Sequence, residues 1–67
     1  MNAFDRALKV AGGPTNLAEA IGVSRQFIHQ LQTGRRPIPP RLCVEIERAT
    51  GVKRAHLRPD IFGPVAA

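Results

Sequence analysis

A glycine between two short segments of helical pattern is the feature that most restricts how this chain can fold. Gly22 divides the sequence LAEAIGVSRQFIHQL, which covers residues 17–31. A sharp turn at this point costs least with glycine, which readily adopts a positive φ. The apolar residues around it have the spacing of two helices that cross at a fixed angle: Leu17, Ala18, Ile21, Val23, Ile28 and Leu31. We therefore predict a helix-turn-helix motif.

The outer face of the second helix of this motif, predicted at residues 24–32, is polar. Ser24 suits the N-cap of this helix, and Gly34 suits the turn that ends it. The side chains expected to point away from the core are Arg25, Gln26, His29, Gln30 and Thr33. A bare helical hairpin would explain two amphipathic helices joined by glycine. It would not explain their full spacing together with a basic, amide-rich face, and the pattern favours DNA binding.

The charge of the chain is concentrated in one stretch. The 67 residues include ten Lys and Arg and five Asp and Glu, which gives a formal net charge of +5. Between Glu19 and Glu45 there are four arginines and no acidic residue. Such a patch favours a polyanionic partner, whereas a surface that only maintains solubility usually mixes both signs. A chain this short forms one domain with a marginal core, so association with a second copy would stabilise it.

Several other classes of protein are disfavoured by the sequence. The lone Cys43 has no disulfide partner and no Cys or His at zinc-ligand spacing, so we expect no metal or other cofactor. No apolar run approaches the ~20 residues of a membrane span, and a signal-peptide pattern is absent. His56 has no partner at catalytic spacing and is interpreted as a surface residue. We expect a soluble, cytoplasmic, nucleoid-associated protein that is not an enzyme.

Cap and proline signals predict the other helices. Asn2 is the expected N-cap of a helix with a buried stripe of Phe4, Ala7, Leu8 and Ala11. The first helix of the motif should cover residues 14–21, with its proline in the first turn. The stretch TGRRPIPP, residues 33–40, is predicted to be a stiff connector, because prolines remove donors and favour extended neighbours.

The C-terminal third of the chain is expected to contain two more helices. One should begin near residue 39 or 40 and end at residue 50, with Leu42, Cys43, Ile46 and Ala49 facing inward. A short one is expected at residues 53–57, where Pro59 would follow its end. The stretch IFGPVAA is predicted to be extended or partly disordered. We therefore expect a helix-turn-helix DNA-binding domain at residues 1–62 and a flexible tail at residues 63–67.

The segment from Phe4 to Phe62 resembles small phage and prophage repressors of the Cro and YdaS type, within the lambda-repressor-like group. The resemblance depends on three pieces of sequence: GGPTNLAEAIGVSRQFIHQL, GRRPIPPRLCVEIERATG and LRPDIF. It implies an all-α, lambda-repressor-like compact bundle of about five short helices. It also implies a transcriptional repressor in a bacterial host cell that acts as a dimer on a short palindromic operator, with double-stranded DNA as its partner.

In this geometry the start of the second helix of the motif enters the major groove. The expected base-reading residues are Arg25, Gln26, His29 and Gln30. Arginine can pair with guanine and glutamine with adenine. A phosphate contact is the alternative role for Arg25, and a merely solvated side chain is the alternative for His29. We expect Phe27 to pack on Leu31 rather than contact a base.

A second set of residues is predicted to contact phosphates. These residues are Thr15, Ser24, Thr33, Arg35, Arg36 and Arg41. For Ser24 and Thr33, helix capping or solvation is the alternative. Many lambda-type repressors begin the first helix of the motif with a glutamine that touches the DNA backbone, but Pro14 stands there in this chain. Thr15 and the free amides of the helix start would have to replace that contact.

Two questions stay open from the sequence. A self-complementary dimer patch is predicted at Val52, Leu57, Ile61 and Phe62, with burial inside the monomer as the alternative. The function could also be that of an antitoxin-type protein that mainly binds a toxin partner, with DNA binding autoregulatory or absent. RNA binding is disfavoured, because the chain has few aromatic residues for base stacking.

Overall fold

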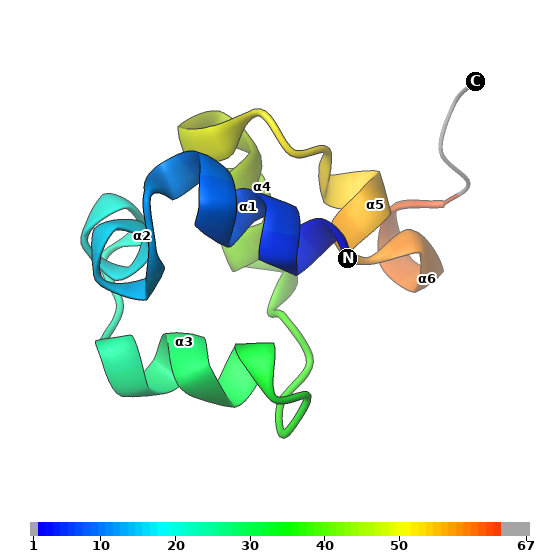
Figure 1. Cartoon of the computed structure of the whole chain (residues 1–67). Coiled ribbons are helices and arrows are strands. Elements are labelled where there is room, and N and C mark those ends of the chain that lie inside the picture. The colour runs from blue at the N-terminus through cyan, green and yellow to red at the C-terminus, as the bar shows by residue number, and fades with distance from the viewer. Residues whose placement is uncertain (1, 64–67) are drawn as a thin grey trace.

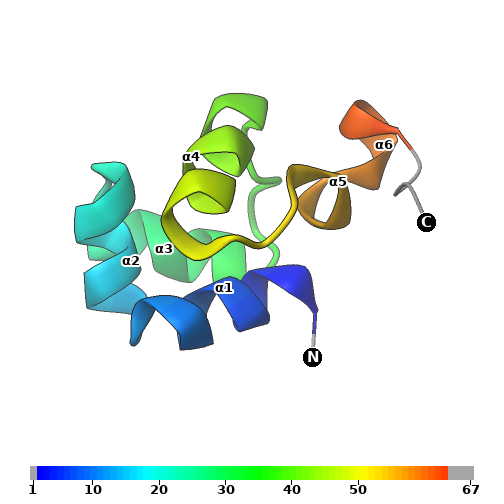
Figure 2. The same cartoon turned by 90° about the horizontal axis from the view of Figure 1, so that it is seen from above.

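The computed structural model describes residues 2–63 and contains only helices in that range (Figure 1). The helices are α1 Ala3–Ala11, α2 Pro14–Ile21, α3 Arg25–Gln32, α4 Pro40–Thr50, α5 Arg54–Leu57 and α6 Pro59–Phe62. The predicted all-α fold class is confirmed. Both views place α2 and the α5–α6 pair at opposite ends of the molecule, with α1 and α4 between them (Figure 2). No helix of the described residues is long and apolar enough to cross a membrane.

The helix ends follow the cap signals of the sequence. The side chain of Asn2 accepts a hydrogen bond from the backbone amide of Asp5 at 2.8 Å, which caps α1. Ser24 caps α3 in the same way, through the amide of Phe27 at 3.0 Å. Between α2 and α3 the chain turns at Gly22, whose φ of 74° lies in the left-handed region. The helix-turn-helix prediction therefore rests on local signals that the structure reproduces.

The core is one apolar cluster to which α1, α2, α3 and α4 all contribute. The largest fully buried side chains are Leu17, Ile28, Ile46 and Cys43. The full buried set is Phe4, Ala7, Leu8, Leu17, Ala18, Ile21, Ile28, Leu31, Ile38, Leu42, Cys43, Ile46 and Val52. Because α3 inserts Ile28 and Leu31 into this cluster, its other side is left at the surface.

The inward-facing stripe of α4 ends on a different residue from the one predicted. Ala49 is exposed, and Thr50 is half-buried instead. Positions three and four residues after Ile46 both lie near the same helix face, and here the later one turns inward. The Thr50 hydroxyl donates to the Ile46 carbonyl at 2.7 Å and accepts from the amide of Val52 at 3.2 Å. The threonine thus ends α4 with both of its hydrogen-bonding roles used.

The prediction that IFGPVAA, residues 61–67, is extended or partly disordered is wrong for residues 61 and 62, which belong to the helix α6 that the sequence did not predict. Pro59 begins α6, because a first-turn proline lacks only an amide that would have no helical partner. The amides of Ile61 and Phe62 donate to the Arg58 carbonyl at 3.1 and 3.0 Å, and Asp60 lies in the first turn. Apart from Gly63, the tail predicted for residues 63–67 lies outside the described residues.

Candidate functional site

The predicted base-reading residues lie together on the outer side of α3. Arg25, Gln26 and His29 are exposed, and Gln30 is half-buried. These side chains point away from the core because Ile28 and Leu31 occupy the opposite side of the helix. In Figure 1, α3 lies along one edge of the molecule, apart from α1 and α4. The arrangement presents guanidinium, amide and imidazole groups on one accessible helix face.

The surroundings of this face are basic and lack acidic residues. We call residues 24–41 the basic segment; its arginines are Arg25, Arg35, Arg36 and Arg41. All four are exposed, and within residues 2–63 none of them forms an ion pair. Removing an acidic partner is therefore not required before these groups bind an anion. A concentrated, unneutralised positive charge raises the local concentration of polyanions.

The connector, residues 33–39, folds back on the end of α3. Gly34 has a φ of 80°, and this turn lets the amide of Arg35 donate to the Gln30 carbonyl at 3.0 Å. The guanidinium carbon of Arg36 lies 6.0 Å from the ring centroid of Phe27. A cation–π contact at an exposed site contributes only about 0.5–1 kcal/mol, so its main effect is to orient the arginine. Phe27 itself packs against the core, as the sequence predicts.

The predicted phosphate-binding hydroxyls differ in their hydrogen bonding. Ser24 is exposed and accepts from the Phe27 amide, which leaves its hydroxyl hydrogen available. Thr33 is exposed, but its hydroxyl donates to the Gln30 carbonyl at 3.3 Å. Thr15 is exposed at the start of α2, where the N-cap Gly13 provides no side-chain hydrogen bond. Ser24 and Thr15 are therefore better placed than Thr33 to donate to an anion.

The four residues of the predicted dimer patch differ in exposure. Val52 is buried in the monomer core, and Leu57 and Phe62 are half-buried against it. Ile61 is 44% exposed. For Val52 the structure thus supports the alternative of burial inside the monomer, because its position after α4 turns it toward the core. The sequence prediction missed Val10 on α1, which is the other large exposed apolar residue of residues 2–63.

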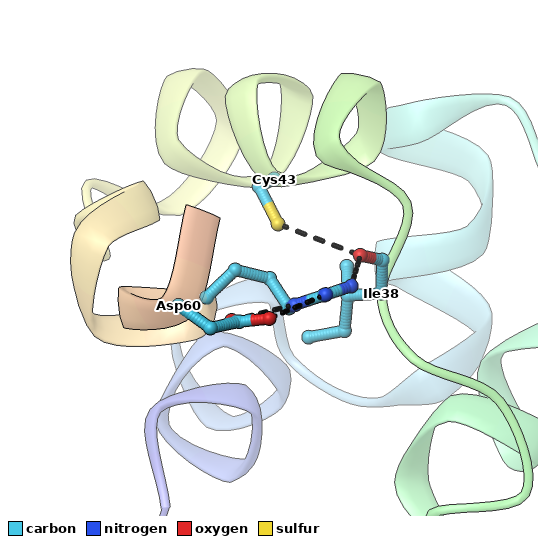
Figure 3. A network of polar contacts seen from close by, with 4 residues as sticks. Ile38, Cys43 and Asp60 are labelled. Atoms are coloured by element: carbon cyan, nitrogen blue, oxygen red, sulfur yellow. Dashed lines mark hydrogen bonds and ion pairs between the residues drawn. The ribbon is translucent and has the colours of Figure 1, made fainter. Parts of the chain in front are cut away.

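A polar network near α6 was not predicted from the sequence (Figure 3). Arg58 donates from Nε and Nη2 to the two carboxylate oxygens of Asp60, at 3.0 and 2.7 Å. Its Nη1 donates to the carbonyl oxygen of Ile38 at 2.8 Å, across 20 positions of the chain. The hydrogen bonds from Arg58 lower the pKa of the Asp60 carboxyl, and the same contact raises the pKa of Arg58. This guanidinium joins the C-terminal helices to the connector.

Of three further residues, one differs from the sequence prediction and two agree with it. Ile38 was treated only as part of the connector, but its side chain is 8% exposed and belongs to the core. Cys43 is buried as predicted, and burial raises the pKa of its thiol. His56 is an exposed residue, as predicted, and its Nδ1 lies 3.3 Å from Nη2 of Arg6. The only sequence signal for the network was the charge pair flanking Pro59.

Comparisons with known proteins agree on one family. The family model described as "Bacterial toxin YdaS" matches residues 4–66. The chain is 42% identical over 60 residues to the "Putative transcriptional regulator YdaS" of Escherichia coli strain K12. That match covers 87% of this chain but 61% of the relative, so the chain spans less than two thirds of that protein's length.

A solved structure gives an independent comparison of the fold. It is described as "Structure of the Cro protein from putative prophage element Xfaso 1 in Xylella fastidiosa strain Ann-1". It superposes with a TM-score of 0.87 at 38% sequence identity. The match covers 96% of this chain and 100% of that chain, so it includes the helices on both sides of the connector.

Proposed function

This chain belongs to the family described as bacterial toxin YdaS, and on that premise we propose that it is a DNA-binding transcriptional regulator. More specifically, we propose that it is a Cro-like repressor that acts as a dimer on a short palindromic operator and has no enzymatic activity. The observation that supports this most is the basic segment, in which four exposed arginines surround α3 without an acidic partner. The names of the two similar proteins, a transcriptional regulator and a Cro protein, agree with it.

Sequence would be read by the exposed side of α3 in the major groove. Arg25 and Gln26 lie in its first turn, where a helix-turn-helix protein contacts base edges. A bidentate contact of arginine with guanine or of glutamine with adenine contributes about 1–3 kcal/mol of discrimination. His29 and Gln30 follow one turn later, and Gln30 is restricted by its partial burial. We therefore assign the strongest base preference to the first two residues.

Position on the duplex would be set by phosphate contacts on both sides of α3. Arg35 and Arg36 supply positive charge just after the C-terminal end of α3, Arg41 supplies it in the first turn of α4, and Ser24 supplies a hydroxyl at the N-terminal end of α3. Thr15 and the first amides of α2 add neutral donors at a helix N-terminus, which attracts phosphate. Such contacts orient the protein without distinguishing one sequence from another.

A dimer follows from how little sequence one α3 can read. An eight-residue helix spans only a few base pairs, too few to select one operator from a genome of competing sites. Two copies related by a two-fold axis would place their α3 helices about 34 Å apart, one turn of the duplex. Ile61, with the half-buried Leu57 and Phe62 beside it, is the part of the predicted dimer patch that remains accessible.

The alternative function is an antitoxin-type protein that mainly binds a toxin partner. One observation is compatible with it: the family model that matches this chain is described as "Bacterial toxin YdaS". In that case DNA binding would be autoregulatory or absent. A protein with no DNA-binding role would not need four exposed arginines without an ion pair in one segment of 18 residues, and for this reason we prefer the regulator.

Selection of bound sequences from a pool of random duplexes tests the proposal. We expect an inverted repeat with half-sites about one helical turn apart. Native mass spectrometry of the selected complex should then give two protein chains per duplex. A pool without any enriched sequence would contradict sequence-specific regulation. One protein chain on an asymmetric site of about 6 base pairs would contradict the dimer.

A further inference from the structure

The two ends of the connector are held in different ways. At the α3 end, the turn at Gly34 and the hydrogen bond from the Arg35 amide to the Gln30 carbonyl at 3.0 Å set its direction. At the α4 end, Ile38 is buried, and its carbonyl accepts from Arg58 at 2.8 Å and faces the Cys43 thiol at 3.9 Å. A thiol is a weak donor. The strong polar contact of the Ile38 carbonyl therefore comes from Arg58, while the neighbouring Pro39 carbonyl accepts from the Cys43 amide at 3.1 Å.

Asp60 determines where the guanidinium of Arg58 lies. Two parallel hydrogen bonds to one carboxylate fix both the position and the plane of a guanidinium. The Arg58 side chain is 20% exposed, whereas that of Arg48 is 75% exposed in its pair with Glu45 at 3.8 Å. An exposed and distant pair like the second one contributes little to structure. The Arg58–Asp60 pair is thus the one built to hold a defined geometry.

We propose that Arg58 and Asp60 are positioning residues for DNA binding, which hold the connector in the shape that presents Arg35 and Arg36 to the phosphate backbone. The inference rests on the proposed function and adds two residues that touch no DNA themselves. Without Arg58, the partly buried Ile38 carbonyl loses its strong donor and the connector samples more conformations. Ordering those conformations on binding weakens the complex. The weakening is independent of sequence, because phosphate contacts carry no sequence information.

Asp60 offers the sharpest test. A purely electrostatic effect of its charge and a role in positioning Arg58 predict changes of opposite sign in DNA affinity when Asp60 is replaced. Asp60→Asn removes a negative charge from a protein of net charge +5, so electrostatics alone would strengthen DNA binding. If Asp60 positions Arg58, the same substitution weakens binding. Glu45→Gln is the matched control, since it removes the same charge from the exposed pair on α4. We expect Glu45→Gln to leave the affinity unchanged or slightly increased.

The experiment measures binding to a duplex of about 30 base pairs and arbitrary sequence over a range of salt concentrations. We expect Asp60→Asn to bind about three-fold more weakly and Arg58→Gln about ten-fold more weakly, because disordered phosphate-binding groups lose affinity. Both should show a shallower dependence on salt. Arg48→Gln, the control for the lost positive charge, should stay within about two-fold. Thermal denaturation of each variant identifies a temperature at which all of them are folded, and binding is measured at that temperature.

A result in which Asp60→Asn binds as tightly as Glu45→Gln overturns the inference and leaves the proposed function standing. A wild-type protein that binds no duplex overturns both. If Arg58→Gln does not fold, Asp60→Asn is measured in the Arg35→Ala/Arg36→Ala background. Because Asp60 is proposed to act through these two arginines, Asp60→Asn should cause no further loss of DNA affinity when both arginines are already alanine. If Asp60→Asn weakens DNA binding in that background as much as it does in the wild type, its effect is a general one on the fold and the inference is overturned.

Discussion

Two stretches of this small protein use their arginines in opposite ways. In the basic segment, residues 24–41, four arginines are exposed and have no ion pair within residues 2–63. In residues 45–60, which we call the paired segment, each acidic residue contacts an arginine: Glu45 with Arg48, Glu47 with Arg54 and Asp60 with Arg58. Of the paired arginines, Arg58 forms the short bidentate contact, and the other two lie 3.8 Å from their carboxylates. The unpaired arginines remain available for a partner.

The two segments also differ in what their hydrogen bonds involve. Within the paired segment a charged side chain takes part, since Glu47 accepts from the amide of Arg54, seven positions away, at 2.9 Å. In the basic segment the surface hydrogen bonds, such as the cap by Ser24 and the turn at Gly34, are local and do not involve its arginine side chains. A hydrogen bond across 20 positions joins the two segments, from Arg58 to the Ile38 carbonyl. The following predictions test whether this division is real.

The largest expected effect comes from removing two arginines of the basic segment. Arg35→Ala/Arg36→Ala should weaken binding to operator and scrambled duplexes alike by about 100-fold, because a dimer loses four phosphate contacts. The slope of log K against log salt should change from about −5 to about −2. Fluorescence anisotropy titrations at several salt concentrations measure both quantities. The control is the double variant Arg48→Ala/Arg54→Ala, which removes the same charge from the paired segment. If it loses as much DNA affinity, the arginines of the two segments do not differ in their role.

A smaller effect, of a different kind, is expected within the basic segment. Gln26→Ala should lose about ten-fold in its preference for the selected operator over a scrambled duplex, since a base contact is lost. Its affinity for the scrambled duplex should be unchanged. Competition binding with both duplexes measures the preference. An equal loss on the two duplexes would make Gln26 a backbone contact rather than a base reader.

Two glycines with the same φ allow a matched comparison of the segments. Gly34 and Gly51 both have a φ of 80°, and a Cβ at either would meet no atom within 4 Å. Alanine at either position should lower the free energy of unfolding by about 1 kcal/mol, because only the strained φ is affected. Gly34→Ala should also weaken DNA binding by about three-fold, since it disturbs the connector. Chemical denaturation measures the stability of both variants, and titration with duplex DNA measures their affinity. If Gly51→Ala weakens DNA binding as much as Gly34→Ala does, the connector has no special role in binding.

The smallest expected effect is a pH dependence in the paired segment. Arg58 lowers the pKa of Asp60 in the folded protein, so this contact stabilises the fold above the ordinary carboxyl pKa. That contribution is lost as the pH falls below about 4. Asp60→Asn should therefore lose less stability than the wild type between about pH 4 and pH 2. Thermal denaturation across this range measures the stability of both proteins. If stability falls equally with pH in the wild type and in Asp60→Asn, the pair does not stabilise the fold.

The sequence was a good guide where the determinants are local. The start of α2 at Pro14, the cap of α3 at Ser24 and the turn at Gly22 each depend on neighbouring residues. The exposure of Arg25 and Gln26 followed from the helical spacing of apolar residues on the other side of α3. These features could be predicted because capping and helical periodicity act over a few positions.

The sequence was a poor guide where contacts are distant in the chain. The hydrogen bond from Arg58 to the Ile38 carbonyl involves a backbone acceptor, which every residue possesses and no motif marks. The burial of Ile38 between two prolines likewise depends on how α4 returns to the core. The helix at Pro59 was missed because a proline was interpreted as an end rather than a beginning.

The division between free and paired arginines can be tested directly by NMR. The Nε–Hε resonances of the arginine side chains report on each guanidinium separately while a DNA duplex is added to the labelled protein. We predict that the four arginines of the basic segment shift during the titration and the three arginines of the paired segment do not. Shifts at the paired arginines, with those of residues 24–41 unchanged, would contradict the account.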